Sequence, residues 1–277
     1  MIYLLCAICS SAAVSAVLRI GESRTKGMYG RFAMNYFAAA VLAFLAMPSK
    51  QFPLDGSGIY ALELGCIQGV LYLLSLFTLQ SNIRKNGVIL SGTFARLGLT
   101  IPMLFAIVGF GELPGILQGI GFVLAIAAIL IIQKKESQTV AQSRSGLIAL
   151  LVISGLTDSM AKVFEETGSR DLDAQFLLIT FIVAFVLSIV MMLYHREHLG
   201  VREILYGCLV GIPNYGSVFF LLKALTVLPA VLVYPTYSAG TILVISLIGV
   251  VAFGERPAKR QWCGLAVILV ALVLLNL

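Results

Sequence analysis

Two charged residues lie deep inside long apolar runs, where a charge must face either a cavity or a partner. Arg96 lies ten residues past Asn86, or ~15 Å along a helix. Asp158 lies twelve residues into a later run, or ~18 Å from the same expected membrane edge. Insertion scales put a charge near the bilayer centre at a cost of at least ~2.5–3.5 kcal/mol. We therefore expect both residues to serve binding, coupling or packing.

The chemistry of these two residues leaves several roles open. The Arg96 guanidinium could bind a substrate carboxylate or phosphate through two hydrogen bonds, or form an ion pair that fixes helix packing. Asp158 could pair with Arg96, hold it until an anion displaces it, or take up a coupling proton. Asp158 is also four residues before Lys162, which allows a simple pair on one helix surface.

Prolines inside apolar runs predict breaks in the helices at a similar depth. Pro213 lies within the segment 211–216, and Pro235 follows Tyr234 directly. Proline removes a helical hydrogen bond, and irregular backbone at membrane depth is tolerated beside protein or a watery cavity. A kink without function is the alternative. We expect a cavity lined by six polar or aromatic side chains: Gln68, Tyr72, Asn214, Tyr215, Tyr234 and Tyr237.

The elements that must position these residues follow from composition. Of 277 residues, 60% are hydrophobic and 12% charged, with a mean hydropathy of +1.00, which excludes an ordinary soluble domain. The apolar runs lack alternation, so they predict helices long enough to cross ~30 Å of hydrocarbon. The sequence predicts an all-α integral membrane protein with ten spans: 2–18, 32–47, 58–79, 87–108, 115–132, 146–163, 174–194, 203–222, 229–252 and 259–276.

The chain repeats itself after about half its length. The pattern F-G-E-x-P-x-x-x-Q-x-x-G begins at Phe110 and again at Phe253, a shift of 143 residues. The pattern G-C-x-x-G begins at Gly65 and again at Gly207. We expect two five-helix halves, 1–132 and 146–277, joined by a cytoplasmic loop at 133–145. Both glutamates of the longer pattern should favour the positive N-terminus of the helix that follows. We interpret Gly111, Glu112, Gly254, Glu255, Pro213 and Pro235 as structural.

Loop charges predict how the halves are oriented. Nearly all Lys and Arg residues follow the odd-numbered spans, whereas the loops after even-numbered spans have only Lys50 and Arg170, with Lys162 at a helix end. The basic loops should be cytoplasmic, which leaves both termini outside. Five spans per half then require the second half to be inverted. Lys223 fits less well, because it ends the eighth span on the external side, where its long side chain could snorkel.

The ten short-looped spans, the five-plus-five repeat and the G-E-x-x-x-x-x-Q-x-x-G stretch resemble the drug/metabolite transporter superfamily, EamA-type, over essentially the whole chain. The resemblance implies a secondary-active transporter that moves a small organic metabolite, such as an amino acid or another carboxylate, through a midplane cavity by alternating access, with export favoured. Cationic drug or quaternary ammonium efflux by proton antiport is an alternative. The small multidrug-resistance relatives carry a glutamate midway along their first helix, whereas the first span here has no acid. A non-transporting membrane component such as a scramblase is a third possibility.

Other functional classes find no support in the sequence. It contains no phosphate-cradling Gly-rich loop, no nucleophile–base pair and no haem or flavin motif, so we expect neither an enzyme nor a cofactor. His195 and His198 have no third ligand beside them, so we expect no metal. The net charge of +6 is scattered through short loops, which argues against nucleic acid. The expected partners are the lipid bilayer of a prokaryotic cell membrane, a small-molecule substrate and a coupling proton, with monomer and homodimer both open.

Overall fold

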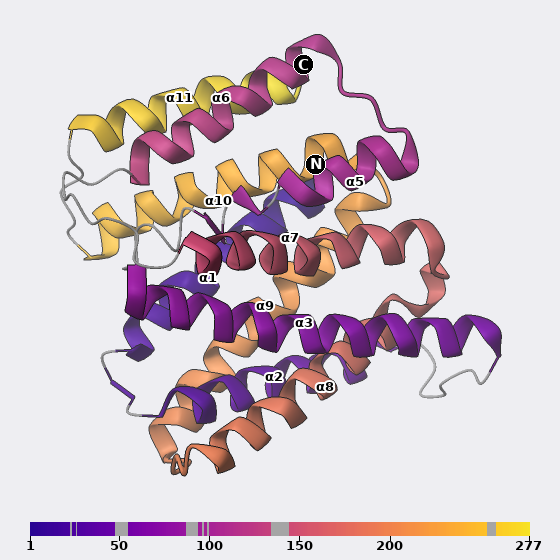
Figure 1. Cartoon of the computed structure of the whole chain (residues 1–277), viewed down its shortest axis with the longest axis vertical. Helices are drawn as coiled ribbons and strands as arrows, with labels where there is room; N and C mark the ends of the chain where they lie inside the picture. Colours follow the sequence, from indigo (N-terminus) through magenta and orange to yellow (C-terminus); the bar gives the residue numbers. More distant parts are fainter. Residues whose placement is uncertain are drawn as a thin grey trace. The chain divides into compact units, whose positions relative to one another are not determined.

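The computed structural model describes the chain except for residues 23, 26, 48–54, 87–93, 96, 99, 134–143 and 254–258. Helices make up the described part (Figure 1). They are α1 (Ile2–Glu22), α2 (Met28–Ala46), α3 (Gly56–Asn86), α5 (Thr100–Phe110), α6 (Ile116–Gln133), α7 (Arg144–Thr167), the short 3-10 helix η1 (Arg170–Leu172), α8 (Asp173–Tyr194), α9 (Val201–Leu225), α10 (Ala230–Phe253) and α11 (Lys259–Leu275).

Six of the described helices are long and apolar enough to cross a membrane, namely α2, α3, α7, α8, α9 and α10. Shorter apolar stretches lie in α1, α5, α6 and α11. The prediction of an all-helical membrane protein is therefore confirmed. The fourth expected span, 87–108, falls partly outside the described residues, and α5 covers its later part.

The predicted breaks at the two prolines are wrong. Pro213 lies inside α9 and Pro235 inside α10, and both helices continue through them. A proline removes one backbone donor, but the hydrogen bonds before and after it can hold a helix together. In hydrocarbon the alternative would be several unsatisfied backbone groups, so continuing the helix is favoured.

The chain divides into two compact units. Unit 1 consists of Met1–Leu73 and Val163–Lys223, and unit 2 of Leu74–Lys162 and Ala224–Leu277. Each unit therefore contains helices from both halves of the sequence. α3, α7 and α9 contribute to both units.

In unit 1, α2 lies along α8 and runs antiparallel to it (Figure 1). Tyr29, at the start of α2, stacks on His195 just past the end of α8, with ring centroids 4.7 Å apart. Further along α2, Phe37 meets Phe185 at 5.7 Å. This pairing supplies the apolar wall on which α3 and α9 pack.

The two G-C-x-x-G copies bring α3 and α9 very close to this wall. A Cβ on Gly69 would lie 2.6 Å from the Val183 Cβ of α8, and one on Gly211 would lie 2.5 Å from the Asn35 carbonyl oxygen of α2. Small residues of this kind let membrane helices approach closely. The first copy therefore packs α3 on α8, and the second packs α9 on α2.

In unit 2, α6 lies along α11 (Figure 1). A Cβ on Gly121 would lie 3.0 Å from the Ala271 carbonyl oxygen, so the start of α6 meets the end of α11. Small side chains fill the core where these helices meet α10: Ala125, Ala128, Ala239, Ile268 and Ala271. α5 packs on α7, where a Cβ on Gly155 would lie 2.5 Å from the Ile101 Cδ1 of α5.

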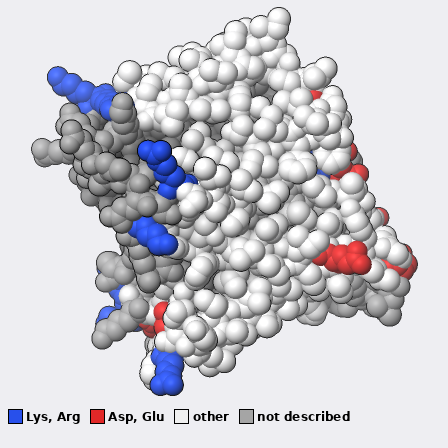
Figure 2. Space-filling view, in the orientation of Figure 1, with Lys and Arg blue, Asp and Glu red and all other residues white. Residues whose placement is uncertain are grey.

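Charged side chains of the described residues lie mainly near the helix ends. In the space-filling view, most of the drawn surface that is not grey carries neither Lys and Arg nor Asp and Glu side chains (Figure 2). Within unit 1, the end of α7 and the start of α8 carry acidic residues, whereas the start of α9 carries Arg202 beside the buried Glu203. The side of the membrane on which each helix end lies stays a prediction.

Gly211→Ala is expected to destabilise the protein. Its Cβ would overlap the Asn35 carbonyl oxygen of α2, and overpacking of this kind typically costs ~1–3 kcal/mol. Thermal unfolding in detergent measures the loss. Gly119→Ala in α6 is the matched control, because nothing lies within 4 Å of a Cβ there, and its Tm should be unchanged or higher. Equal Tm values for the two variants would contradict the close packing of α9 on α2.

Candidate functional site

Five aromatic rings form a continuous cluster in unit 1. The ring cluster consists of Tyr36 from α2, Tyr72 from α3, Phe181 from α8, and Tyr215 and Phe219 from α9. Successive centroids lie 6.0 Å (Tyr36–Tyr72), 6.2 Å (Tyr72–Phe181), 6.4 Å (Phe181–Tyr215) and 5.5 Å (Tyr215–Phe219) apart. These spacings are typical of favourable aromatic contacts. The cluster joins four helices; Tyr36 and Phe181 are buried in it, and the other three rings are partly exposed.

Buried polar atoms lie on the helices that carry these rings. Gln68, one turn before Tyr72 on α3, is only 3% exposed, and its Oε1 has no hydrogen-bond partner within the described chain. The same holds for the buried Tyr215 hydroxyl. Asn214 donates through Nδ2 to Asn35 Oδ1 at 3.1 Å. Because leaving a buried polar atom unsatisfied costs free energy, the first two atoms are suited to hydrogen-bond a bound solute.

An ion pair lies beside the ring cluster. The Lys223 Nζ is 2.8 Å from Asp173 Oδ2 and 5.9 Å from the centroid of the Phe219 ring. Asp173 is in the first turn of α8 and Lys223 in the last turn of α9, so each charge suits the dipole of its helix end. Lys223, which the sequence left as a residue that could snorkel, thus has a carboxylate of the same unit as its partner.

A second ion pair lies in unit 2. The Lys162 Nζ is 2.7 Å from Glu112 Oε1, and the lysine side chain is only 2% exposed. Glu112 Oε2 also accepts a hydrogen bond from the Val231 N–H at 3.2 Å. Its carboxylate therefore lies at the N-terminus of α10, which begins at Ala230, and not at that of α6 as the sequence predicts.

The turn before Glu112 explains this placement. Gly111 has a φ of +70°, a conformation that favours glycine after a helix end. The Glu112 N–H then donates back to the Ala106 carbonyl oxygen at 3.0 Å. The chain turns at the end of α5, and this directs the carboxylate to α7 and α10.

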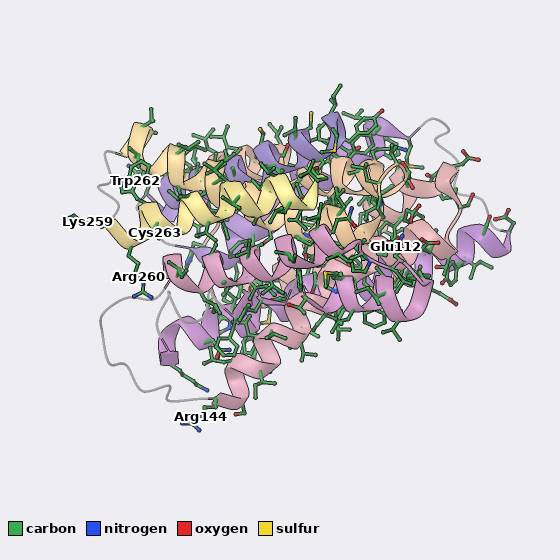
Figure 3. The ribbon with its side chains drawn as sticks, turned by 90° about the horizontal axis from the view of Figure 1, so that it is seen from above. Glu112, Arg144, Lys259, Arg260, Trp262 and Cys263 are labelled. Carbon is green, nitrogen blue, oxygen red and sulfur yellow. The ribbon has the colours of Figure 1, made fainter. Side chains whose placement is uncertain are left out.

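The two ends of unit 2 differ in charge. Glu112 lies at one end of its helices (Figure 3). Arg144, at the start of α7, and Lys259 and Arg260, at the start of α11, lie at the other, together with the exposed Trp262. Basic residues with a nearby tryptophan are typical of a membrane–water interface, most often the cytoplasmic one for the basic residues.

Asp158 and Tyr234 connect α7 to α10. The Tyr234 hydroxyl donates to the Asp158 backbone carbonyl oxygen at 3.0 Å, and the tyrosine is completely buried. Tyr234 thus packs two helices of unit 2 together. Tyr237 and the Asp158 side chain are half-buried in the same unit.

The predicted site residues divide between the two units. Gln68, Tyr72, Asn214 and Tyr215 belong to unit 1, whereas Asp158, Tyr234 and Tyr237 belong to unit 2. Arg96, Gly254 and Glu255 lie outside the described residues, so the relation of Arg96 to Asp158 stays a prediction. Gly98, near Arg96 in sequence, packs against α7 at Gly155.

Sequence reasoning missed several residues of the unit 1 site. Tyr36, Phe181 and Phe219 lie in apolar runs as ordinary aromatic residues, and nothing in their spacing distinguishes them. A signal did exist for the ion pair. Asp173 opens one span and Lys223 closes the next, which puts an acid and a base at the same predicted membrane edge.

Membrane-length helices with polar side chains buried among them define the protein as an integral membrane protein. Comparison with known families then identifies the class. Residues 145–277 match the EamA-like transporter family. This family is part of the drug/metabolite transporter superfamily, and the match covers the second half of the chain.

Two further comparisons cover nearly the whole chain. An uncharacterised protein of Haemophilus influenzae is 25% identical over an alignment of 277 positions. The alignment covers 95% of this chain and 93% of the relative. A solved structure, described only as "Crystal structure of protein", superposes with a TM-score of 0.79 at 15% sequence identity, over 99% of this chain and 98% of the other. The latter likeness concerns the fold alone.

Glu112→Gln is expected to lower the stability of the protein by roughly 3 kcal/mol, because it removes a carboxylate beside a buried ammonium. The double variant Glu112→Gln/Lys162→Met removes both charges and should recover most of that loss. Thermal unfolding in detergent measures both. Glu166→Gln, an exposed carboxylate on α7, should leave Tm unchanged. If Glu112→Gln unfolds at the parental Tm, the Lys162–Glu112 pair does not hold α7, α10 and the end of α5 together.

Proposed function

We propose that the protein is a secondary-active transporter that exports a small organic metabolite, such as an amino acid or another carboxylate, by alternating access. The observation that carries the proposal is the pair of buried polar atoms, Gln68 Oε1 and the Tyr215 hydroxyl, which lack partners within the described chain on helices that carry the ring cluster. A solute that supplies hydrogen bonds and a flat surface would satisfy both features. The match of residues 145–277 to a transporter family supports the same function.

We further propose that the two halves form inverted repeats. The packing of the glycine pairs supports this, because the first copy packs α3 on α8 whereas the second packs α9 on α2. α3 and α9 are the third and eighth predicted spans, and α2 and α8 are the second and seventh. A two-fold relation between the halves would exchange each helix with its counterpart and produce this pattern.

The directions of the helices also support inversion. Along α3, Gly65 lies against Ile179 and the later Gly69 lies against Val183, so α3 and α8 run parallel. α2 and α8, which are the second spans of the two halves, run antiparallel. An odd number of spans per half requires this relation.

The proposed orientation places the basic helix ends in the cytoplasm and both termini outside, in a cell membrane. Cysteine labelling tests it together with the inversion. α1 and α7 open the two halves, and the exposed Arg24 and Glu166 lie near their C-terminal ends. In a variant whose five native cysteines are alanines, Glu166→Cys should react with a membrane-impermeant maleimide on intact cells, whereas Arg24→Cys should react only after permeabilisation. Labelling of both from the same side would refute inverted halves.

Arg96 and Asp158 are the residues we propose for substrate charge and coupling. A guanidinium at membrane depth is suited to a carboxylate, which it can hold through two hydrogen bonds. Asp158 is half-buried on α7, where a carboxylate can exchange a proton during the transport cycle. In this proposal the proton gradient drives export, and the substrate and the proton use separate residues.

Transport into reconstituted vesicles tests these roles, with a panel of amino acids, other carboxylates and cationic dyes. Arg96→Ala should lower the transport of the carboxylate substrate about tenfold or more, as expected for loss of a charged hydrogen-bond pair. Asp158→Asn should abolish pH-driven accumulation while exchange down a gradient continues. Arg202→Gln, at an exposed helix start, serves as the control.

Each result separates the proposal from its rivals. Parental transport by Arg96→Ala would refute the anion-binding role, and parental accumulation by Asp158→Asn would refute the coupling role. If only cationic dyes move, and Asp158→Asn stops them, cation efflux replaces metabolite export.

A further inference from the structure

The ion pair of unit 1 combines an accessible partner with an enclosed one. The Lys223 side chain is 34% exposed, whereas that of Asp173 is 10% exposed, and the two are joined at 2.8 Å. The ammonium also lies over the Phe219 ring, a favourable cation–π arrangement. Lys223 is therefore the more accessible charge of the pair, and an enclosed carboxylate lies beside it.

The rings of α9 continue from this pair. Lys223, Phe219 and Tyr215 follow one another at intervals of four residues, which places them on one face of the helix. The Phe219 and Tyr215 rings stack with centroids 5.5 Å apart and an interplanar angle of 21°. The buried Tyr215 hydroxyl has no hydrogen-bond partner within the described residues. A flat group could lie along these rings while its charged end stays at Lys223.

The charges of Lys223 and Asp173 restrict which charged groups a bound solute can carry. A solute with only a carboxylate would place two anions beside one ammonium, and would compete with Asp173 for it. A solute with only an ammonium would place two cations beside one carboxylate. Like charges at such short range are unfavourable in a partly desolvated site. A solute with one charge of each sign gives every charge an opposite neighbour and leaves the net charge of the site unchanged.

We propose that the Lys223–Asp173 pair binds the headgroup of a zwitterionic solute, with the solute carboxylate at Lys223 and its ammonium at Asp173. An aromatic or other flat apolar body of the solute lies on Phe219 and Tyr215. This inference rests on the proposed transport function and adds to it a second binding site, besides the one proposed at Arg96, and a selection rule. Zwitterions bind in preference to monoanions and monocations of the same shape.

Three probes that share a phenyl ring test the selection rule. L-Phenylalanine carries both charges, phenylacetate only the carboxylate, and phenethylamine only the ammonium. Isothermal titration calorimetry of the purified full chain in detergent should give phenylalanine an affinity at least about tenfold above the other two, which corresponds to ~1.4 kcal/mol. Equal binding of all three probes, or no binding of phenylalanine by the folded parent, would overturn the proposal.

Variants of the pair separate a binding role from a purely structural one. Lys223→Met and Asp173→Asn should each weaken phenylalanine binding about tenfold or more, as expected for charged hydrogen bonds. The double variant Lys223→Met/Asp173→Asn leaves neither charge of the pair, so it should fold and yet lose the preference for the zwitterion. Glu166→Gln, an exposed carboxylate at the end of α7, should bind like the parent. Parental affinity and selectivity in the double variant would assign the pair to packing alone.

Uptake into vesicles, measured in parallel, distinguishes this site from the transport function. If the double variant moves the parent's substrates at the parental rate, the site is refuted while transport stands. If the parent binds phenylalanine through Lys223 but moves no solute of the panel, the site stands and the transport function is refuted.

Discussion

Hydrocarbon supplies neither hydrogen bonds nor counter-ions, and this constraint governs the described part of the chain. Backbone groups must be satisfied within helices, which is why α9 and α10 continue through Pro213 and Pro235. Charges near helix ends follow the same rule, since Lys162 lies 2.7 Å from Glu112 and Lys223 lies 2.8 Å from Asp173. Polar atoms that depart from the rule, such as Gln68 Oε1, are then the informative ones, because a solute can complete them.

The fold also requires that helices approach one another closely, and glycine allows this. Apolar side chains gain little by leaving lipid for a protein interface, so membrane helices associate mainly through packing. Gly69 lets α3 approach α8, and Gly211 lets α9 approach α2. These contacts bring Tyr72 of α3 and Tyr215 of α9 to Phe181 of α8. The ring cluster thus depends on residues that contribute no side chain to it.

The sequence predicted what depends on local properties of the chain. Helices follow from apolar length, and the glycine patterns follow from repetition. It could not predict which helix end receives Glu112, because that depends on the turn at Gly111 and on α10, more than a hundred residues away. It also missed Phe181, since an aromatic residue in an apolar run becomes part of a site only through the helices that pack around it. The pairing of Asp173 with Lys223 required the same tertiary information.

The Lys162–Glu112 and Lys223–Asp173 ion pairs show how one type of interaction can have different roles. Lys162 is almost fully enclosed, and its partner Glu112 also receives the Val231 N–H, so a solute could enter only by breaking both contacts. Lys223 is a third exposed and lies over an aromatic ring that continues into a cluster. An accessible ammonium such as that of Lys223 can exchange its partner carboxylate for a solute carboxylate with little loss of free energy. This requires that the solute also carries a positive charge, which then pairs with Asp173. Accessibility, rather than the distance between the charges, therefore favours a packing role for the first pair and a binding role for the second.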